Sequence, residues 1–398
     1  MNVLVVVDGT YFRTKDKAVY SQGVYGYSFF KRYLTVFKEV YVMARIKDVT
    51  SVPEGLKLAN GERVSFLALP SYKGPIQYMS KRFKVKKLTK ELIKDFECCI
   101  LRVPSATAQG FFSIINKQMP TALEVVVDPW EYFAPNTITK WYRPFVRVYW
   151  TLQLKKMCRK ADGVSYVTSS YLQGKYPCEA FKEKPGYFTA SYSSVEIKDG
   201  SIAEPRVYEE RKGTFHFVHA AVSFTTEGKG HKILMQALKQ VVDAGYDADV
   251  TFIGDGPLRS NFEDYAKELG IQDRVIFVGR LPGAEAVRKQ MMKADVFVFP
   301  TRAEGLPRVL IEAMAEGLPC ISTPVCGIPE ILEKEWMFPY DDIKGFSACM
   351  IKCINNPEIL TEQSKRNVIV AKKFVNSTLA GERNKFYETL SEITREGR

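Results

Sequence analysis

The sequence lacks the long apolar run that a membrane-spanning helix requires. None of its 398 residues lies in a stretch of about 18 uninterrupted apolar positions. The opening run, residues 1–7, is too short for a secretory signal and has no basic start. We therefore expect a protein of the cytoplasm.

Cysteine pairs with metal or redox spacing are also absent, and histidine is scarce. The eight cysteines include no C-x-x-C pair, so neither a zinc site nor a redox dithiol is indicated. The three histidines, His216, His219 and His231, all lie in the C-terminal half. The N-terminal half therefore has no imidazole for acid–base chemistry.

Positive charge is distributed unevenly along the chain. The formal charge is +12, with 31 Lys and Arg against 17 Asp and Glu in residues 1–200, and 26 against 28 in residues 201–398. The N-terminal half should therefore have an anionic partner. Nucleic acid, a phosphate-bearing substrate and an anionic membrane surface all satisfy this condition.

Short apolar runs alternate with helical patterns in both halves of the chain. This alternation predicts parallel sheets covered on both faces. A polar stretch at 192–211 reads as a linker between two domains. The expected strands are 3–7, 40–45, 64–69, 98–103, 123–127 and 163–167, then 214–220, 249–254, 274–278, 295–300 and 320–323. Doubly wound domains facing each other would place the site in a cleft at the carboxyl ends of their strands.

The segment 296–317 contains the most informative motif. An expected strand ends at Pro300, a loop carries Glu304 and Gly305, and Pro307 suits the start of a helix. The free N–H groups of that helix start would bind a pyrophosphate. Glu312 follows eight residues after Glu304, and two carboxylates beside a phosphate site are suited to accepting hydrogen bonds from sugar and ribose hydroxyls.

Either glutamate alone is better explained as a solvated residue at a helix start. Their spacing in a strand–loop–Gly–Pro–helix setting, followed by Gly317 and Gly327, is more specific. The segment resembles the E-x7-E signature of glycosyltransferase family 4, a group of retaining GT-B enzymes. Further patterns of that family are matched at 227–230, 252–259 and 275–281, so that the resemblance covers roughly 214–332.

The resemblance implies a role for each matching position. Glu304 would bind hydroxyls of the donor sugar, and the backbone at Gly305 and Leu306 would hold sugar and phosphate. Glu312 would bind the ribose diol. Lys229 would neutralise the diphosphate as it binds and as it leaves.

Other positions complete the expected donor site. The backbone at Arg280 and Leu281 would meet the nucleobase, Val309 and Gly254 would contribute donor contacts, and Arg308 would add a second positive charge. A plain surface arginine is an equally good interpretation of Arg308.

Two departures from the family pattern are visible. The region 222–228 has no arginine before the lysine, so Arg308 or a base of the N-terminal domain would supply the second charge. The N-terminal domain also lacks the family's histidine, and Asp128 occupies the matching position after a strand. Asp128 could orient the acceptor hydroxyl, or it could be an Asp-Pro helix cap.

Weaker signals concern glycines and acids. Gly9 and Gly23 lie in an expected loop after the first strand, where the family brings glycine to the donor phosphate, although a plain loop explains them too. Asp247 and Asp249 resemble a metal-binding D-x-D but precede a strand, so we read them as a solvated turn. We expect no bound metal and no cofactor, because the nucleotide sugar is a substrate.

Basic and aromatic residues interleave in the N-terminal half. Residues 81–90 carry six positive charges and no acid, and aromatics alternate with bases over 140–156. Such surfaces suit an anionic bilayer. They also suit single-stranded nucleic acid, but no nucleic-acid motif accompanies them. A solvated helix face with core aromatics is the plainer alternative.

Together these features predict a metal-independent, hexosyltransferase-type GT-B enzyme of cell-surface polysaccharide biosynthesis. It would move sugar with retention from a nucleotide-diphosphate sugar to a hydroxyl of a glycan or lipid-linked acceptor, at the inner face of the cell membrane. The expected domains are 1–200 for the acceptor, 201–372 for the donor, and a helical segment 373–398 that returns to the N-terminal domain. A sugar-nucleotide epimerase and a non-catalytic membrane-associated scaffold are the alternatives.

Overall fold

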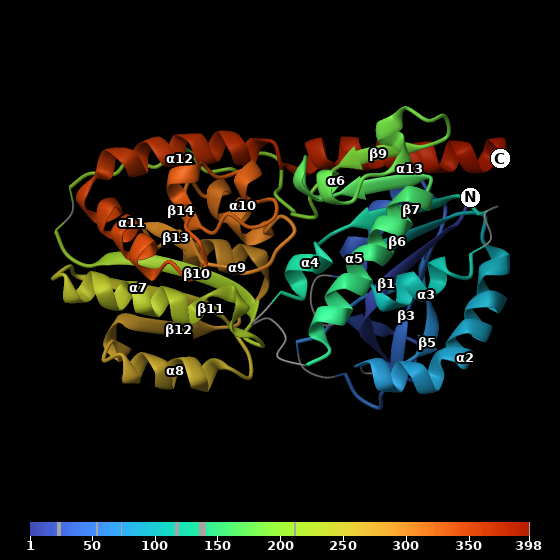
Figure 1. Ribbon diagram of the computed structural model, residues 1–398, viewed down its shortest axis with the longest axis horizontal. Coiled ribbons are helices and arrows are strands. Elements are labelled where there is room, and N and C mark those ends of the chain that lie inside the picture. Colours follow the sequence, from blue (N-terminus) through green and yellow to red (C-terminus); the bar gives the residue numbers. More distant parts are fainter. Residues whose placement is uncertain are drawn as a thin grey trace. The chain divides into compact units, whose positions relative to one another are not determined.

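The chain forms two compact α/β units (Figure 1). The computed structural model describes residues 1–21, 25–52, 55–72, 74–115, 119–134, 141–210 and 212–397. Unit 1 comprises Met1–Val127, Val148–Tyr192 and Ala380–Arg398, and unit 2 comprises Asp128–Arg147 and Ser193–Leu379. Across the described ranges, every helix is too short or too polar to cross a bilayer.

The sheet of unit 1 is mainly parallel. Its parallel strands lie in the order β5-β3-β1-β6-β7-β8-β9, so the chain winds outward from β1 in one direction and then from β6 in the other. The short strands β2 and β4 add an antiparallel extension beside the end of β1. The bounds are β1 Val3–Arg13, β2 Val19–Ser21, β3 Val40–Asp48, β4 Lys57–Leu58, β5 Val64–Pro70, β6 Cys99–Val103, β7 Thr121–Val125, β8 Gly163–Tyr166 and β9 Phe188–Ser191.

Helices connect these strands, and α3 and α5 lie in front of the sheet in Figure 1. The helical elements assigned to this part of the chain are α1 Tyr27–Lys31, η1 Arg32–Thr35, α2 Gly74–Leu92, η2 Ile93–Asp95, α3 Ala106–Phe112, α5 Arg143–Lys160, α6 Tyr171–Lys175, η3 Glu179–Lys182 and α13 Asn376–Glu396. Helix α5 begins within the stretch grouped with unit 2, and most of α13 is grouped with unit 1.

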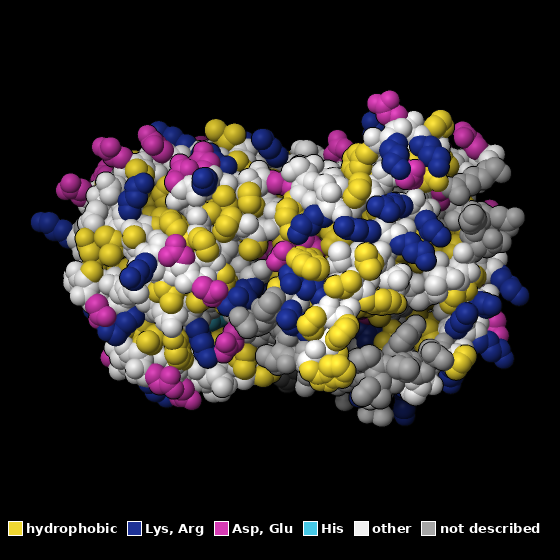
Figure 2. Space-filling view, viewed as in Figure 1, with side chains coloured by type: hydrophobic (Ala, Val, Ile, Leu, Met, Phe, Trp, Pro, Cys, Tyr) yellow, Lys and Arg dark blue, Asp and Glu magenta, His cyan; other side chains and the backbone are white. Residues whose placement is uncertain are grey.

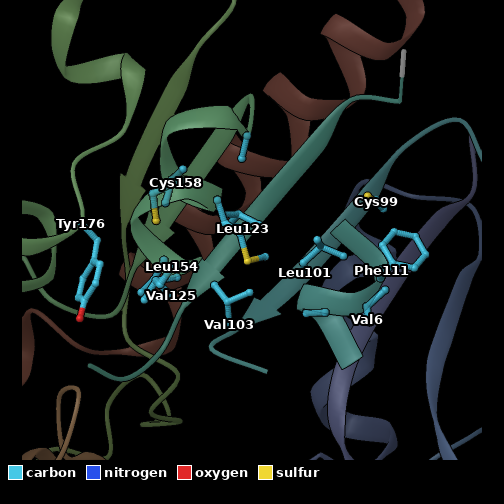
Figure 3. Close-up of a cluster of buried hydrophobic side chains, with 14 of the residues drawn as sticks. Val6, Cys99, Leu101, Val103, Phe111, Leu123, Val125, Leu154, Cys158 and Tyr176 are labelled. Carbon is cyan, nitrogen blue, oxygen red and sulfur yellow. The ribbon is translucent and has the colours of Figure 1, made fainter. Parts of the chain in front are cut away.

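Side-chain alternation along β6 and β7 divides the interior of unit 1 into two faces. Leu101 and Leu123 point to the face covered by α3 and α5, where they pack with Phe111 and Leu154 (Figure 3). Cys99 belongs to the same cluster, and burial raises the pKa of its thiol. All eight cysteines are free and buried, as expected for small hydrophobes.

The opposite face of the sheet buries a charge network centred on Glu124 of β7. Its carboxylate pairs with Arg102 of β6 and accepts hydrogen bonds from the hydroxyls of Tyr33 at 3.0 Å, Tyr192 at 3.1 Å and Tyr387 at 2.7 Å. Burial alone would raise the pKa of Glu124, but Arg102 and the tyrosine hydroxyls hold it below its usual value. Since Tyr387 lies on α13, the network fastens the C-terminal helix to this sheet.

The sheet of unit 2 is parallel throughout its described strands. Their order is β12-β11-β10-β13-β14, so the direction of winding reverses between β10 and β13. The strands are β10 Phe215–Ser223, β11 Ala248–Asp255, β12 Val275–Gly279, β13 Val296–Phe299 and β14 Cys320–Ser322. The helical elements are α4 Pro129–Tyr132, η4 Glu227–Lys229, α7 His231–Asp243, α8 Arg259–Glu268, η5 Gln272–Arg274, α9 Gly283–Met291, α10 Arg308–Ala315, η6 Ile328–Glu330, η7 Lys334–Trp336, α11 Ile343–Asn355 and α12 Pro357–Lys372.

The prediction of two parallel-sheet α/β domains is confirmed, but one local expectation is wrong. The expected loop after residue 7 is instead a continuation of β1 to Arg13. The pairing of β1 with β3 resumes at Thr10 after a register shift that follows Val6. The residues between these two positions form a bulge, so the strand continues beyond them. Asp8 accepts hydrogen bonds from Gly9 N–H at 3.0 Å and from Arg45 at 2.6 Å, which closes this bulge.

Candidate functional site

The residues expected to bind the donor follow the carboxyl ends of the unit 2 strands. Lys229 follows β10, Gly254 lies at the end of β11, Arg280 follows β12, and Glu304 follows β13. Since all these strands are parallel, the four positions share one edge of the sheet. Lys229 and Glu304 follow the neighbouring strands β10 and β13, where the direction of winding reverses. Ligands of open α/β sheets bind at such a point.

Lys229 and Glu304 meet directly in an ion pair. Their side chains are 32% and 19% exposed, so the pair is open to a ligand while partly shielded from water. The ammonium of Lys229 also lies 5.8 Å from the centre of the Phe299 ring. An ammonium has three donors, and the pair with Glu304 uses one of them.

Gly230 brings the lysine turn against the end of β13. Its φ is +80°, and a Cβ atom added here would lie 1.8 Å from the carbonyl oxygen of Pro300. No other residue type permits this approach at that φ. The adjoining loops are also joined by a hydrogen bond from Arg302 N–H to the Gly228 carbonyl oxygen at 2.9 Å.

A second layer of contacts around these loops was missed by the sequence analysis. The Tyr340 hydroxyl donates to the carbonyl oxygen of Glu227 at 2.9 Å, and the Arg302 guanidinium lies 3.6 Å from the centre of the Tyr340 ring. Arg302 also pairs with Asp341 at 2.9 Å. Arg302, two residues before Glu304, was the only part of this layer that its position in the motif could have indicated. Its aromatic partner, Tyr340, lies 38 positions further along the chain.

Pro307, expected in the first turn of a helix, is instead the N-cap of α10, which begins at Arg308. No side chain caps this helix, so its first N–H groups are available to a ligand anion. Leu306, just before the cap, is 8% exposed and anchors the loop. Gly305 accepts a hydrogen bond from Gly327 N–H at 2.9 Å.

Glu312 lies on α10 in an environment short of hydrogen-bond donors. Burial raises the pKa of its carboxyl, while Arg308 and Arg288 partly oppose that rise. Within the described residues, only burial and more distant charges act on this carboxyl, and no hydrogen bond is among the causes of its shift. A half-buried carboxylate without protein donors depends on water or a ligand for its hydrogen bonds. Val309 lies half-buried at the start of the same helix.

Two histidines lie beneath the lysine turn, both fully buried. His219 bonds through Nε2 to the Lys229 carbonyl oxygen at 2.7 Å, and burial lowers its pKa to about 4. His231 stacks on Phe262 with ring centres 4.4 Å apart, and burial lowers its pKa to about 2. Both rings are neutral at physiological pH and support the turn from inside.

The remaining donor positions are less closely connected to this centre. Gly254, with φ +131°, allows β11 to approach Ala221, since an added Cβ atom would lie 1.7 Å from that carbonyl oxygen. Arg280 is exposed and Leu281 half-buried after β12, two strands away from β10. Both residues lie at the carboxyl edge of the unit 2 sheet, and their contact with a nucleobase stays a prediction.

Asp128 is fully buried and caps helix α4, with Oδ1 accepting a hydrogen bond from Trp130 N–H at 2.8 Å. The Asp-Pro cap, the alternative reading of this residue, is therefore present. Gly9 lies in the bulge of β1 with φ +144°. Gly23 lies outside the described residues.

The D-x-D acids bind side chains of their own unit. Asp247 pairs with Arg274 and accepts a hydrogen bond from Thr214 at 2.7 Å. Asp249 contacts His216 at 2.9 Å. Within the described ranges, acids, histidines and cysteines form no group of three that could hold a metal ion.

Known proteins resemble the chain at two levels. Residues 216–356 match the family model described as glycosyl transferases group 1. Protein CapJ of Staphylococcus aureus is 28% identical over 383 residues, which covers 94% of this chain and 91% of CapJ. The amylovoran biosynthesis glycosyltransferase AmsK of Erwinia amylovora is 30% identical over 141 residues, 33% of this chain and 34% of AmsK.

The fold likeness extends over the whole chain. Sucrose-phosphate synthase of Thermosynechococcus elongatus superposes with a TM-score of 0.72 over 98% of this chain and 99% of its own, at 15% identity. At that identity the likeness concerns the fold alone. It confirms the expected GT-B class, and the family match confirms the resemblance found in the motifs.

Proposed function

We propose that the protein is a glycosyltransferase with a specific reaction, because residues 216–356 match the family model of the glycosyl transferases group 1. The protein transfers a sugar from a nucleotide-diphosphate sugar to a hydroxyl of a glycan or lipid-linked acceptor, with retention of anomeric configuration. The ion pair of Lys229 and Glu304 at the switch point of unit 2 is the observation that carries the proposal.

In this proposal each group of the site has a separate contact with the donor. Glu304 accepts hydrogen bonds from sugar hydroxyls, and Glu312 obtains from the ribose diol the donors that the described residues around it do not provide. The open N–H groups of α10 and the Arg308 side chain hold the diphosphate. The backbone at Arg280 and Leu281 contacts the nucleobase.

The leaving diphosphate gains negative charge as the bond to the sugar breaks. Lys229 and the N-terminus of α10 stabilise that charge, so we propose that no divalent metal is needed. The acceptor hydroxyl attacks the sugar from the face that the diphosphate leaves, and its proton passes to the departing phosphate. No protein nucleophile is required, which is consistent with retention.

The decisive experiment compares Glu304→Gln and Lys229→Ala with Lys239→Ala. Lys239 is a matched control because it pairs with exposed Asp243 on α7 of the same unit. We expect transfer to fall by about 10²–10³-fold in the two site variants and to be unchanged in the control. Release of nucleoside diphosphate measures the rate, and the anomeric coupling constant of the product measures retention. Full activity in both site variants would overturn the assignment.

The same assay separates the alternatives. Incubating the nucleotide sugar alone and finding its epimer would support a sugar-nucleotide epimerase, whereas binding without any turnover would support a scaffold. Unchanged transfer in excess EDTA is expected for a metal-independent enzyme. Asp128→Asn preserves the helix cap, so loss of transfer without loss of stability would reveal a role in orienting the acceptor.

We also propose that the protein acts in cell-surface polysaccharide biosynthesis at an anionic membrane. Another relative, VipC/TviE of Salmonella typhi, is named as a Vi polysaccharide biosynthesis protein and is 45% identical over 78 residues. Helix α5 exposes Phe145 at 72%, Tyr149 at 51% and Leu152 at 59%, positions that share one helix face. Yellow and dark-blue side chains lie next to each other where Figure 1 draws α5 (Figure 2). Apolar side chains among bases suit a bilayer interface.

Vesicle flotation tests this surface. Phe145→Ser with Leu152→Ser should release the protein from phosphatidylglycerol vesicles, because the apolar face no longer inserts. Ile369→Ser on α12 is the control, since Ile369 is equally exposed at 61% in unit 2. Equal flotation of all variants, or equal binding to neutral phosphatidylcholine vesicles, would refute membrane docking through α5.

A further inference from the structure

Unit 1 contains a cavity that the donor site does not use. Its volume is about 620 Å³, within the usual range for ligand sites. Part of its lining lies where β1 and β3 end, at Arg13 and Asp48, the last residues of two neighbouring parallel strands, and Ser65 and Phe66 near the start of β5 line it as well. The carboxyl edge is where α/β sheets place their binding sites.

The charge lining this cavity is positive. Arg13, Lys15 and Lys17 contribute three cationic groups, and Asp48 contributes the single acid. The Asp48 carboxylate is already paired with Arg13. The guanidinium donates from Nε to Oδ1 at 2.7 Å and from Nη2 to Oδ2 at 3.2 Å. That hydrogen bond lowers the pKa of Asp48 and raises the pKa of Arg13, so both stay charged. The excess positive charge is carried by Lys15 and Lys17. It is reduced by the carboxylate of Asp16 between them, which accepts a hydrogen bond from the Thr14 hydroxyl.

A hairpin turn holds the lysines in place. Thr14 N–H donates to Ala18 O, and Lys17 N–H donates to Thr14 O, both at 3.0 Å. Asn60 clamps the turn by accepting from Val19 N–H at 2.7 Å and donating to Lys17 O at 3.2 Å. The ammonium groups are therefore attached to an ordered frame beside the cavity.

Lys17 is unusual within this turn because its φ is +66°. That conformation favours glycine, and a lysine there is strained. Backbone strain of this kind clusters at functional sites, where the side chain is needed. A glycine would satisfy the turn better but would remove one of the cavity's charges.

The other lining groups suit a saccharide. Ser65 offers a hydroxyl to sugar hydroxyls, and Phe66 forms an aromatic wall. The Thr14 hydroxyl and the Asn60 amide already form hydrogen bonds within the turn and shape the rim of the cavity. The Phe66 ring is fixed by Tyr11, with ring centres 4.8 Å apart. Polar groups beside an aromatic face and an excess of positive charge define a site for sugars that carry an oxyanion.

We propose that this cavity binds an anionic saccharide, namely the charged segment of the acceptor glycan. The anion is a carboxylate or a phosphate attached to a sugar, and Lys15 and Lys17 bind it. Assignment of that saccharide as the acceptor rests on the proposed transfer reaction. Binding itself depends only on the cavity.

Isothermal titration calorimetry on the full chain tests the proposal with three probes. Tetragalacturonate carries carboxylates, glucose 1-phosphate carries a phosphate, and maltotetraose is the neutral reference. At least one anionic probe should bind more tightly than maltotetraose, and the identity of that probe distinguishes a carboxylate from a phosphate. If neither anionic probe exceeds maltotetraose, the proposal is wrong.

Variants locate the binding. Lys15→Gln with Lys17→Gly should weaken binding of the anionic probe by about tenfold or more, while the glycine relieves strain in the turn. Lys239→Gln is the matched control, because Lys239 lies on α7 of unit 2, where it pairs with exposed Asp243. Unchanged binding in the double variant, or weakening by Lys229→Ala instead, would place the anion elsewhere and overturn the proposal.

Titration of nucleotide sugars into the same proteins separates the two proposals. Anionic saccharide binding without nucleotide-sugar binding would keep the cavity assignment and reject the transfer reaction. Sugar transfer from the nucleotide sugar, with no saccharide binding in unit 1, would keep the transfer reaction and reject the cavity assignment.

Discussion

The two units differ in how far the protein supplies partners for a buried or half-buried carboxylate. In unit 1, buried Glu124 is compensated by Arg102 and three tyrosine hydroxyls, which hold its pKa down. In unit 2, Glu312 is half-buried without a hydrogen bond from the described residues, and its pKa is raised. A fully partnered charge stabilises a fold, whereas an incompletely partnered one is ready for a ligand.

Removing the cation from the compensated network should have the largest effect. Arg102→Met removes the cation paired with the Glu124 carboxylate and leaves the tyrosine hydroxyls and the charge of Arg32, and we expect unit 1 to lose about 3–5 kcal/mol of stability. Urea unfolding monitored by circular dichroism measures the loss. Unchanged stability would show that the tyrosines and Arg32 compensate the charge without Arg102.

Removing a single donor from the same network should cost less. Tyr387→Phe deletes the 2.7 Å hydrogen bond to Glu124, with an expected cost of about 1.5–3 kcal/mol because the acceptor is charged. Hydrogen exchange should show faster opening of α13, since this bond fastens that helix. Tyr132→Phe, at a side chain 53% exposed, is the control and should have no effect.

Neutralising the uncompensated carboxylate should act in the opposite direction. Glu312→Gln is expected to raise stability by about 0.5–1 kcal/mol while weakening donor binding, because the amide no longer accepts two hydrogen bonds as an anion does. Thermal unfolding and calorimetry measure the two quantities. Lower stability together with unchanged donor affinity would contradict the comparison.

The two carboxyl groups should also respond oppositely to acid. The pKa of Glu124 is lowered, so the stability it contributes is present above its unfolded-state value and is lost as pH falls through its folded-state value. The pKa of Glu312 is raised, so its destabilising charge is removed as pH falls. Donor affinity should therefore decline on acidification before unit 1 unfolds, and Glu312→Gln should flatten that decline.

The histidines beneath the lysine turn should contribute the smallest effect. The pKa values of His219 and His231, lowered by burial to about 4 and 2, leave both rings neutral between pH 6 and 8. His231→Phe should change stability by less than about 1.5 kcal/mol, because its ring already stacks among aromatic residues and neither ring nitrogen finds a partner. A donor affinity that falls in this variant would show that packing positions Lys229.

Local sequence patterns determined the two α/β sheets, most of their strands, and the order of Lys229, Glu304 and Glu312 along the chain. These features depend on apolar runs, glycines and spacing, which are short-range properties. The motifs at 227–230 and 304–312 could be identified because each one lies within a single strand–loop–helix unit.

Tertiary structure alone decided which of these groups meet. Lys229 reaches Glu304 because β10 and β13 are neighbours and Gly230 packs on Pro300, a contact across 70 positions. The Glu124 network and the cavity around Lys17 likewise join residues whose separation in the chain has no periodic signal. The physical reason is that the pairing of strands distant in sequence depends on the free energy of the whole fold. A sequence motif, by contrast, depends only on residues close to it in the chain.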